Sequence, residues 1–582
     1  TGACVIISNT CACQSNGQCN NGNPCDGVET CGNDGQCQPG IPVSCPPSAD
    51  ECLVNVCQQV TGTCAPVATN HGGPCDDGDA CTATDVCRAG QCVGSGLPDD
   101  SAGDWTVVSA SPNGVSVYDV APDGAGGLWA LLGYGDSLRL GPTDGGGELQ
   151  LDNNSTTWPR AFAVAHYSAD GTLTNLRRVA RSRDRILGGQ IAASGDGGFT
   201  IGWRYLQAQD QLGAGAASVT LVDGTLSRYN DAVVAHYTAA GTYGWHRVAR
   251  NAASPRLDST PTGTALLTAS HSSTSPLKLE VPGQATTVIS EPGVSIVEYG
   301  VTGGIVRAAR VLKGADDANG SCSVTVEGRV LCRGSFHSGS PAVGLELASG
   351  AGGSLYRQGG YDGFIALDAP AGGARWLRGV GTAGEDETTS CAVVDDRIAC
   401  LAVVGFEMST DDDATAVVYD PSGALHGFPP IHANAKAPAV LLTLVDLDGQ
   451  LVAGVRHEAL DWPTFAGATE LMATDSSLFA YGGGRTGHRW WGSTPLPTST
   501  KARSGLVAEI DVDDGQLLWA TKAGESDTSL WPKLLAPTTS GPGLTLAGFT
   551  KGAYTIGGLS GTADHGQLFL TRLNSAGGAA CP

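Results

Sequence analysis

The chain has 582 residues, more than one hydrophobic core usually serves, so at least two domains are expected. Its formal net charge of −24 excludes nucleic-acid binding of the kind that depends on Lys and Arg, and it also disfavours attachment to anionic lipid. With 84 glycines, 15% charged residues and no run near the roughly 20 apolar residues that cross a bilayer, we expect a loop-rich chain without a membrane span.

Fifteen of the 20 cysteines lie within the first 92 residues and define an N-terminal arm, residues 1–100. Twelve of them form three similar units, namely Cys19, Cys25, Cys31 and Cys37, then Cys45, Cys52, Cys57 and Cys64, then Cys75, Cys81, Cys87 and Cys92. Turn residues separate them and large apolar side chains are scarce, so cross-links must replace a core. Because His71 is the one histidine of the arm, we expect disulfides rather than a metal site.

The phrase Cys75-Asp-Asp-Gly-Asp-Ala-Cys81-Thr-Ala-Thr-Asp-Val-Cys87 resembles the slime-mould-type cysteine-rich repeat of large secreted myxobacterial proteins. The similarity covers residues 19–92. It implies an extracellular or cell-surface arm with no enzymatic role of its own. The cysteines themselves also indicate a secreted protein, so we expect that a signal peptide has already been removed before Thr1.

Three cysteines of the arm, Cys4, Cys11 and Cys13, stand outside the three units and leave an odd count. Near the other end of the chain, Cys581 has no obvious partner in the body. We predict that Cys581 is bridged to one of these three, and a bridge between two chains is the alternative.

The rest of the chain, residues 104–582, repeats one phrase seven times. Its clearest copies are Ala-Val-Ala-His166-Tyr167-Ser-Ala-Asp-Gly171 and Val-Val-Ala-His236-Tyr237-Thr-Ala-Ala-Gly241. Each predicts a hairpin with a glycine turn, and a second hairpin precedes each one. Two hairpins per unit predict an all-β, seven-bladed β-propeller, for which a series of two-sheet sandwiches is the alternative. The phrasing resembles the bacterial β-propeller repeat family of secreted proteins.

The seventh unit ends after its turn and lacks a final strand. The segment Asp104-Trp105-Thr-Val-Val-Ser matches that strand in type, so we predict that residues 104–109 supply it and close the ring. Residues 475–500 are interpreted as an insertion in the sixth unit.

Four cysteines of the body stand at hairpin spacing. Cys322 and Cys332 flank a loop containing Gly328, and Cys391 and Cys400 flank a shorter loop. Counting outward from each turn places both pairs at non-hydrogen-bonded positions, where the backbones approach to about 4.5 Å. Both pairs are therefore predicted to be disulfides.

Motifs that carry chemistry are sparse. The sequence has no His-Glu-x-x-His, phosphate-binding loop or Gly-x-Ser-x-Gly motif. His166 and His236 recur at the same place in two units, so we interpret them as structural. A possible binding group that occurs once is His488 with Trp490 and Trp491, which could stack on a sugar ring or pack under their own loop.

The acidic run Asp411, Asp412 and Asp413 is the first candidate for calcium, although no Glu closes a calcium loop and turn formation is the simpler explanation of such residues. Apart from that candidate we expect no cofactor. An enzyme acting in the propeller funnel would need Asp, Glu, Arg and Tyr converging from several blades, and the sequence alone reveals no such cluster.

These observations predict a secreted, non-enzymatic structural or surface protein, the subunit of an extracellular assembly or filament in which the arm attaches to a neighbour. The expected partners are copies of the same protein or cell-surface carbohydrate. A monomeric adhesin that binds carbohydrate or protein on the propeller face is the alternative, and a hydrolase or lyase using the funnel is a third hypothesis.

Overall fold

The computed structural model describes residues 13–574 except for 60, 70–74, 76–83, 89–90, 96–104, 109–113, 142–147, 154–159, 183–186, 206–208, 214–218, 223–230, 315–316, 326, 338–343, 352, 357–359, 370–374, 383, 407–416, 424, 428–438, 459–469, 474–476, 485–489, 492–493, 496–502, 536–542 and 557–558. The chain forms two compact units, an arm up to residue 96 and a body from residue 97 onward. The described residues contain no helix long and apolar enough to cross a membrane.

The arm is a series of small two-stranded sheets. A short 3-10 helix, η1 (Asn16–Gln18), precedes the pairs β1 (Thr30–Cys31) with β2 (Cys37–Gln38), β3 (Leu53–Cys57) with β4 (Cys64–Ala68), and β5 (Thr84–Arg88) with β6 (Gln91–Ser95). Between described residues of the arm, six disulfides join Cys13 to Cys31, Cys19 to Cys37, Cys25 to Cys57, Cys45 to Cys64, Cys52 to Cys87, and Cys75 to Cys92. Such a density of bridges indicates an oxidising environment.

The bridges follow a rule that connects neighbouring units. The first and fourth cysteines of a unit pair with each other, as in Cys45–Cys64. The second cysteine pairs with the third of the next unit, as in Cys25–Cys57 and Cys52–Cys87. Cys13 takes the second position of an incomplete unit and pairs with Cys31. Of the three partners that the sequence suggested for Cys581, Cys13 is therefore excluded. Cys4, Cys11, Cys81 and Cys581 lie outside the described residues.

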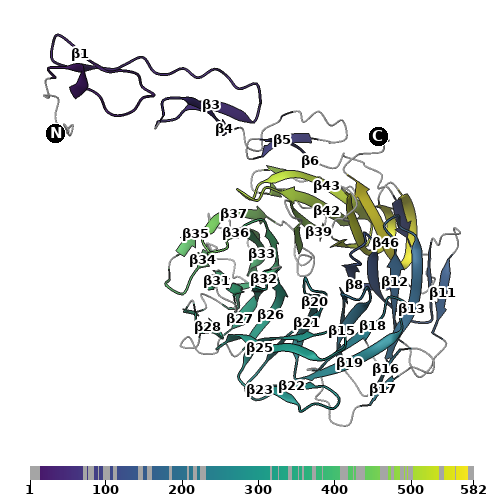
Figure 1. The fold of residues 1–582 in the computed structure, drawn as a ribbon. Helices are drawn as coiled ribbons and strands as arrows, with labels where there is room; N and C mark the ends of the chain where they lie inside the picture. Colours follow the sequence, from purple (N-terminus) through teal and green to yellow (C-terminus); the bar gives the residue numbers. More distant parts are fainter. Residues whose placement is uncertain are drawn as a thin grey trace. The chain divides into compact units, whose positions relative to one another are not determined.

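The body is all-β, and its antiparallel sheets are arranged around a common centre (Figure 1). The first sheet contains β8 (Ser116–Pro122), β9 (Leu128–Tyr134), β12 (Arg160–Tyr167), β13 (Leu173–Ser182), β16 (Gln209–Leu212) and β17 (Val219–Val222). The second contains β14 (Leu187–Ala193), β15 (Phe199–Tyr205), β18 (Asp231–Tyr237), β19 (Tyr243–Arg250), β22 (Leu277–Glu280) and β23 (Thr287–Ile289). The third contains β20 (Ala253–Ser259), β21 (Ala265–His271), β24 (Gly293–Tyr299), β25 (Ile305–Lys313), β28 (Leu345–Leu347) and β29 (Ser354–Leu355).

Two further six-stranded sheets and one longer sheet complete the body. The fourth contains β26 (Asp317–Val324), β27 (Val330–His337), β30 (Asp362–Asp368), β31 (Trp376–Gly381), β34 (Val417–Tyr419) and β35 (Leu425–Gly427). The fifth contains β32 (Glu385–Val394), β33 (Arg397–Phe406), β36 (Ala439–Asp446), β37 (Leu451–Glu458), β40 (Trp490–Trp491) and β41 (Thr494–Pro495). The last contains β38 (Glu470–Ala473), β39 (Leu478–Gly484), β42 (Arg503–Ile510), β43 (Leu517–Ser526), β44 (Ser529–Leu535), β45 (Gly543–Ile556), β46 (Leu559–Asn574) and β7 (Trp105–Val108). A separate pair joins β10 (Ser137–Leu140) to β11 (Leu149–Asp152).

Each six-stranded sheet holds one hairpin more than the two that the sequence suggests. The extra hairpin reaches the sheet only after the chain has built the first hairpin of the next sheet. For example, β20 and β21 start the third sheet, β22 and β23 return to the second, and β24 and β25 continue the third. Neighbouring sheets are therefore interlocked by the chain itself.

The two longest strands, β45 and β46, connect the part of the last sheet that contains β43 with the part that contains β44. The first part of β45 pairs with β44, whereas Tyr554 and Ile556 near its end pair with β43. A register shift between Thr550 and Gly552 separates the two parts, and Gly552 has a φ of 86°, which favours glycine.

Residues 478–484 form the regular strand β39 of the last sheet. The segment 475–500 is therefore not the insertion that the sequence suggested.

The first strands of successive sheets contact one another around the centre of the body. Thus β8 contacts β14, β14 contacts β20, β20 contacts β26, β32 contacts β38, and β38 contacts β44, which in turn contacts β8. At the seam β7 pairs with β46, with Trp105 opposite Arg572 and Val108 opposite Phe569. The seam thus combines a strand from each end of the body.

The repeated phrase supplies the core. Tyr167, Tyr237 and Tyr299, which stand at the same place in three units, are fully buried between sheets. The disulfides Cys322–Cys332 and Cys391–Cys400 join directly opposed residues of β26 with β27 and of β32 with β33, each with Cα atoms 4.1 Å apart. These are the two pairs that the hairpin spacing predicts.

Candidate functional site

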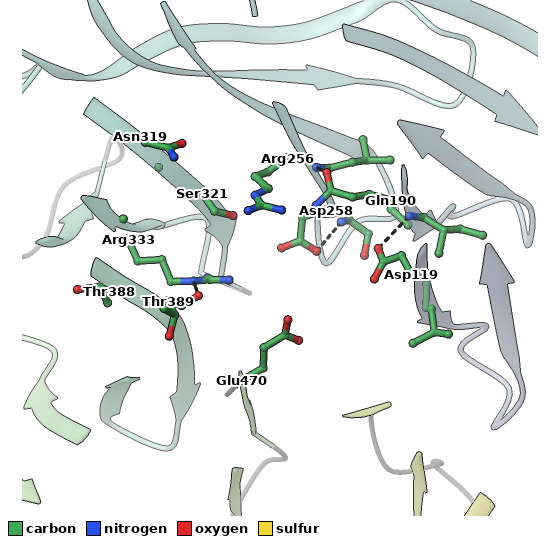
Figure 2. A pocket seen from close by; sticks show the side chains of 18 of the residues that line it. Asp119, Gln190, Arg256, Asp258, Asn319, Ser321, Arg333, Thr388, Thr389 and Glu470 are labelled. Carbon is green, nitrogen blue, oxygen red and sulfur yellow. Dashed lines mark hydrogen bonds between the residues drawn. The ribbon is translucent and has the colours of Figure 1, made fainter. Parts of the chain in front are cut away.

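Strands around the centre of the body, mostly the first strands of the sheets, enclose a cavity of about 330 Å³ (Figure 2). Charged side chains line it from several sheets: Asp119 on β8, Arg256 and Asp258 on β20, Arg333 on β27, Glu387 on β32 and Glu470 on β38. Strands place alternate side chains on the same face, so Arg256 and Asp258 both reach the cavity.

Two cations point into the cavity, Arg256 and Arg333 (Figure 2). Arg333 is positioned by its Nε, which donates to the carbonyl oxygen of Thr389 at 3.0 Å. Burial lowers the pKa of Arg333, the carboxylates of Glu470 and Asp258 oppose that shift, and the positive charge of Arg256 adds to it. The two like charges are therefore close enough to disfavour each other.

Asp258 is a carboxyl group of the cavity wall whose pKa is raised toward neutral pH. Enclosure by protein raises its pKa to about 6, while the Ser259 amide and Arg333 act against this rise and Asp119 adds to it. The Ser259 amide donates to Asp258 Oδ1 at 2.8 Å. The side chain is nevertheless exposed to the cavity, so water in the cavity screens its charge. The pKa of Glu387 is also raised by burial, against the effect of Arg256 and Arg333.

The other polar side chains are held by neighbouring strands. Asp119 Oδ2 accepts from the Ile191 amide at 3.0 Å, and Gln190 Oε1 accepts from the Leu257 amide at 2.7 Å. The Tyr481 hydroxyl donates to Glu470. The wall of the cavity is thus fixed by bonds between adjacent sheets, and it presents carboxylates, amides and hydroxyls together with two guanidinium groups.

This arrangement suits acid–base chemistry on a polar ligand. A carboxyl group with a pKa near the working pH can both accept and donate a proton. Nearby arginines can stabilise negative charge on a bound group, and perturbed carboxyl groups gathered in a cavity are typical of functional sites.

The histidines of the repeated phrase have structural roles in the hairpins. His166 Nε2 lies 2.9 Å from Asp123 Oδ2, and His236 Nε2 lies 3.1 Å from Asp196 Oδ2. Each imidazole also packs against a tryptophan of its own sheet, His166 on Trp129 and His236 on Trp245. The histidine–aspartate contact recurs in two units, which agrees with a role in the fold, whereas Trp129 lies on the strand before His166 and Trp245 on the strand after His236.

The other candidates from the sequence are not brought into the cavity by the described part of the chain. Trp490 and Trp491 form β40, which lies between the end of β37 and the edge strand β41 of the fifth sheet. His488 and the run Asp411, Asp412 and Asp413 lie outside the described residues.

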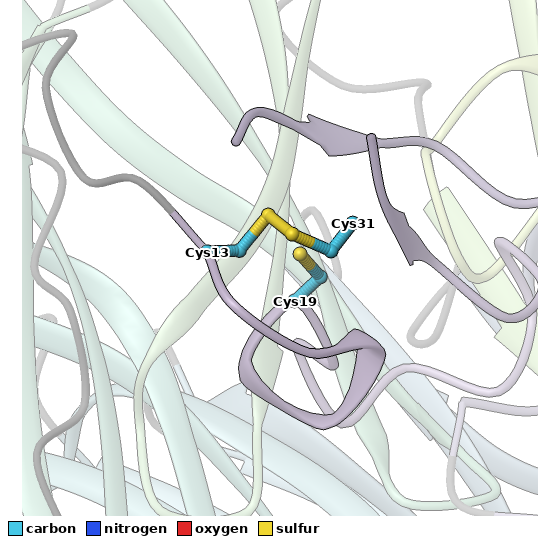
Figure 3. Close-up of side chains that lie close together, drawn as sticks. All are labelled: Cys13, Cys19 and Cys31. Carbon is cyan, nitrogen blue, oxygen red and sulfur yellow. A yellow bond between two sulfur atoms is a disulfide. The ribbon is translucent and has the colours of Figure 1, made fainter. Parts of the chain in front are cut away.

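Two groups of cysteines in the arm bring three sulfur atoms close together, Cys13 with Cys19 and Cys31, and Cys52 with Cys75 and Cys92. Cys13 and Cys31 are joined to each other, as Figure 3 shows, and Cys19 is joined to Cys37. The second group is likewise divided between the bridges Cys52–Cys87 and Cys75–Cys92. Because thiolates bind metals and disulfide sulfurs are not thiolates, we interpret both groups as cross-links.

No family model and no curated protein matches the chain. Among solved structures it is similar to the polysaccharide lyase Uly1, with a TM-score of 0.36 and 10% identity over 80% of this chain and 90% of that chain. The Dos1 propeller matches with a TM-score of 0.29 and 9% identity over 81% and 96% of the two chains. An apocarotenoid oxygenase of Synechocystis matches with a TM-score of 0.31 and 10% identity over 81% and 94%. The neighbours thus include a propeller.

The expectation of a non-enzymatic structural protein is therefore corrected. The similar structures include lyases and an oxygenase. The body also contains the converging acidic and basic side chains whose absence had argued against a funnel site. Sequence reasoning missed them because they are spread over five strands and no spacing connects those strands.

Proposed function

We propose that this protein binds a small polar ligand in the central cavity of a β-propeller and carries out acid–base chemistry on it. The observation that carries the proposal is the convergence of Arg256, Asp258, Arg333, Glu387 and Glu470 from four sheets on one cavity. The cavity volume lies at the small end of the range for ligand pockets. Asp258 is the proposed proton-transfer group.

We further propose that the propeller has seven blades and that the protein is secreted. Five six-stranded sheets support this blade count, together with a longer sheet in which β38 and β44 start two successive blades. The pairing of β7 with β46 supports closure of the ring by residues 104–109. The disulfides of the arm and body support an extracellular location.

Ligand binding is the property to test first. We expect polar metabolites from a screen by thermal shift to raise the melting temperature of the wild-type protein. The Arg256→Met and Arg333→Met variants should lose these shifts, because each removes a charged group that faces the cavity.

A matched control is Arg139→Met, which changes an exposed arginine on β10. This variant should respond to the same compounds as the wild type. The proposal is wrong if no compound stabilises the wild type, or if the cavity variants respond as the wild type does.

A further inference from the structure

The side chains that line the cavity indicate which chemical class of ligand it binds, an inference that rests on the proposed function. Arg256 and Arg333 face one space, and each guanidinium can form two parallel hydrogen bonds to a planar carboxylate. An anion bound between them would relieve the repulsion of two like charges. The Arg333–Thr389 hydrogen bond fixes the orientation of one of the two groups in advance, which lowers the cost of binding.

The charge on that anion is limited by the acidic residues nearby. Asp119, Asp258, Glu387 and Glu470 line the same cavity. A phosphate ester carries a charge of about −1.5 to −2 at neutral pH and would meet stronger repulsion than a carboxylate with a single charge. A monoanion therefore fits the site better than a phosphorylated compound.

The rest of the wall indicates the remainder of the ligand. Asp119, Gln190, Asn319, Ser321 and Glu470 offer oxygen and nitrogen atoms from several directions. Hydroxyl groups of a ligand can donate to the carboxylates and accept from the amides and hydroxyls. Burying such a wall against an apolar ligand would leave its polar groups without partners, which is costly.

We propose that the ligand is a sugar acid, whose carboxylate binds between Arg256 and Arg333 and whose hydroxyl groups donate to Asp119 and Glu470. A single hexuronate unit is a small polyhydroxylated monoanion and so meets the charge, size and polarity of the cavity. Asp258 then stands beside the ring, where it can exchange a proton with the bound sugar.

The test compares sugars that share a ring and differ in the charge of the group at C6. Binding of D-glucuronate and D-galacturonate is measured by calorimetry beside glucuronamide, D-glucose and D-galactose. At least one uronate should bind tenfold or more tightly than its neutral counterparts. Binding should tighten from pH 7.5 to pH 5, because protonation of Asp258 removes a negative charge near the sugar carboxylate.

Variants separate charge recognition from damage to the fold. Arg333→Met should abolish the preference for the uronate, Arg333→Lys should retain part of it, and Arg139→Met should keep it fully. Unfolding curves of all three would show that the body remains folded.

Failure of this inference differs from failure of the proposed function. Equal binding of charged and neutral sugars would overturn the sugar-acid assignment and leave a cavity for neutral sugars. The same assignment fails if both uronates are inert but other polar compounds from the screen bind. If nothing binds in either experiment, the proposed function fails as well.

Discussion

A buried acidic residue next to the cavity wall, Asp386 on β32, illustrates how single residues set the properties of this fold. Its side chain is 2% exposed, and its oxygens accept from the Thr382 amide at 2.6 Å and the Gly405 amide at 2.7 Å. Burial raises its pKa to about 7, these hydrogen bonds oppose the rise, and the charge of Asp362 adds to it. Asp386 therefore holds a proton in the folded protein that it releases when unfolded at mildly acidic pH.

This pKa predicts a loss of stability as pH rises. A carboxyl group with a raised folded pKa contributes most below its unfolded pKa, and that contribution is lost as pH rises from about 4 through 7. Each unit of pKa difference corresponds to about 1.4 kcal/mol. In the Asp386→Asn variant this loss should vanish, so its unfolding free energy relative to the wild type should increase between pH 4 and pH 8.

Denaturant unfolding of both proteins at pH 4 and pH 8 measures this difference in unfolding free energy. Groups that titrate alike in the two proteins contribute equally and drop out of the comparison. Asp448→Asn, at an exposed turn position, is the control and should follow the wild type. Parallel pH profiles for wild type and Asp386→Asn would contradict the prediction.

At the scale of elements, a Trp-x-Arg sequence on one sheet docks onto a glycine turn of the next. Trp245 Nε1 donates to the Val301 carbonyl and Arg247 Nε donates to the Gly303 carbonyl, both at 2.6 Å. Two sheets further on, Trp376 and Arg378 make the same contacts with Leu447 and Gly449 at 3.0 and 2.7 Å. The glycine turn and the tryptophan strand of the repeated phrase are thus partners between sheets.

Substitution of Gly449 tests the contact between the tryptophan strand and the glycine turn. It has a φ of 80°, and an added Cβ would lie 2.5 Å from Trp376 Cγ. Gly449→Ala should therefore cost about 1–2 kcal/mol from the left-handed backbone, plus about 1–3 kcal/mol from overpacking against the indole ring. Chemical denaturation measures the sum.

Gly423 is a matched control for the backbone contribution. It also has a φ of 80°, its amide likewise donates to an aspartate carbonyl three residues earlier, and an added Cβ would meet nothing within 4 Å. Gly423→Ala should show the backbone cost alone. Equal losses in the two variants would show that the tryptophan contact does not matter.

The sequence indicated hairpins and their partners better than it indicated the site. The phrases around Tyr167 and Tyr237 mark buried strands because a glycine turn and alternating apolar residues are local signals. The third hairpin of each six-stranded sheet could not be predicted, because a return to the preceding sheet leaves no local signal in strands as short as β22 and β23. Arg256, Asp258 and Arg333 escaped because their convergence depends on which strands surround the centre. The segment Ala253–Ser259 contains Pro255 and two charged residues, so it resembles a loop rather than an inner strand.

At the scale of the whole molecule, the pairing rule of the arm leaves one position open. The second cysteine of each unit pairs with the third of the next, and Cys81 is the second of the last unit. We therefore predict that Cys81 pairs with Cys581, and that Cys4 pairs with Cys11. These four residues lie outside the described part of the chain, so the rule alone carries the prediction.

Peptide mapping without reduction decides between the pairings. One cross-linked peptide should join the segment around Cys81 to the C-terminal peptide. A bond from Cys581 to Cys4 or Cys11, or to a second chain, would show that the rule ends with the third unit.

The staggered bridges also govern how the arm responds to proteases. Their loops overlap from Cys13 to Cys92, so every peptide bond in that stretch lies inside at least one closed loop. A single cleavage there opens a loop but releases no fragment. Loss of any piece requires a second cut in the same loop or reduction of its disulfide. An arm of exposed turns, an easy substrate for nicking, thus keeps its covalent continuity after it has been cut.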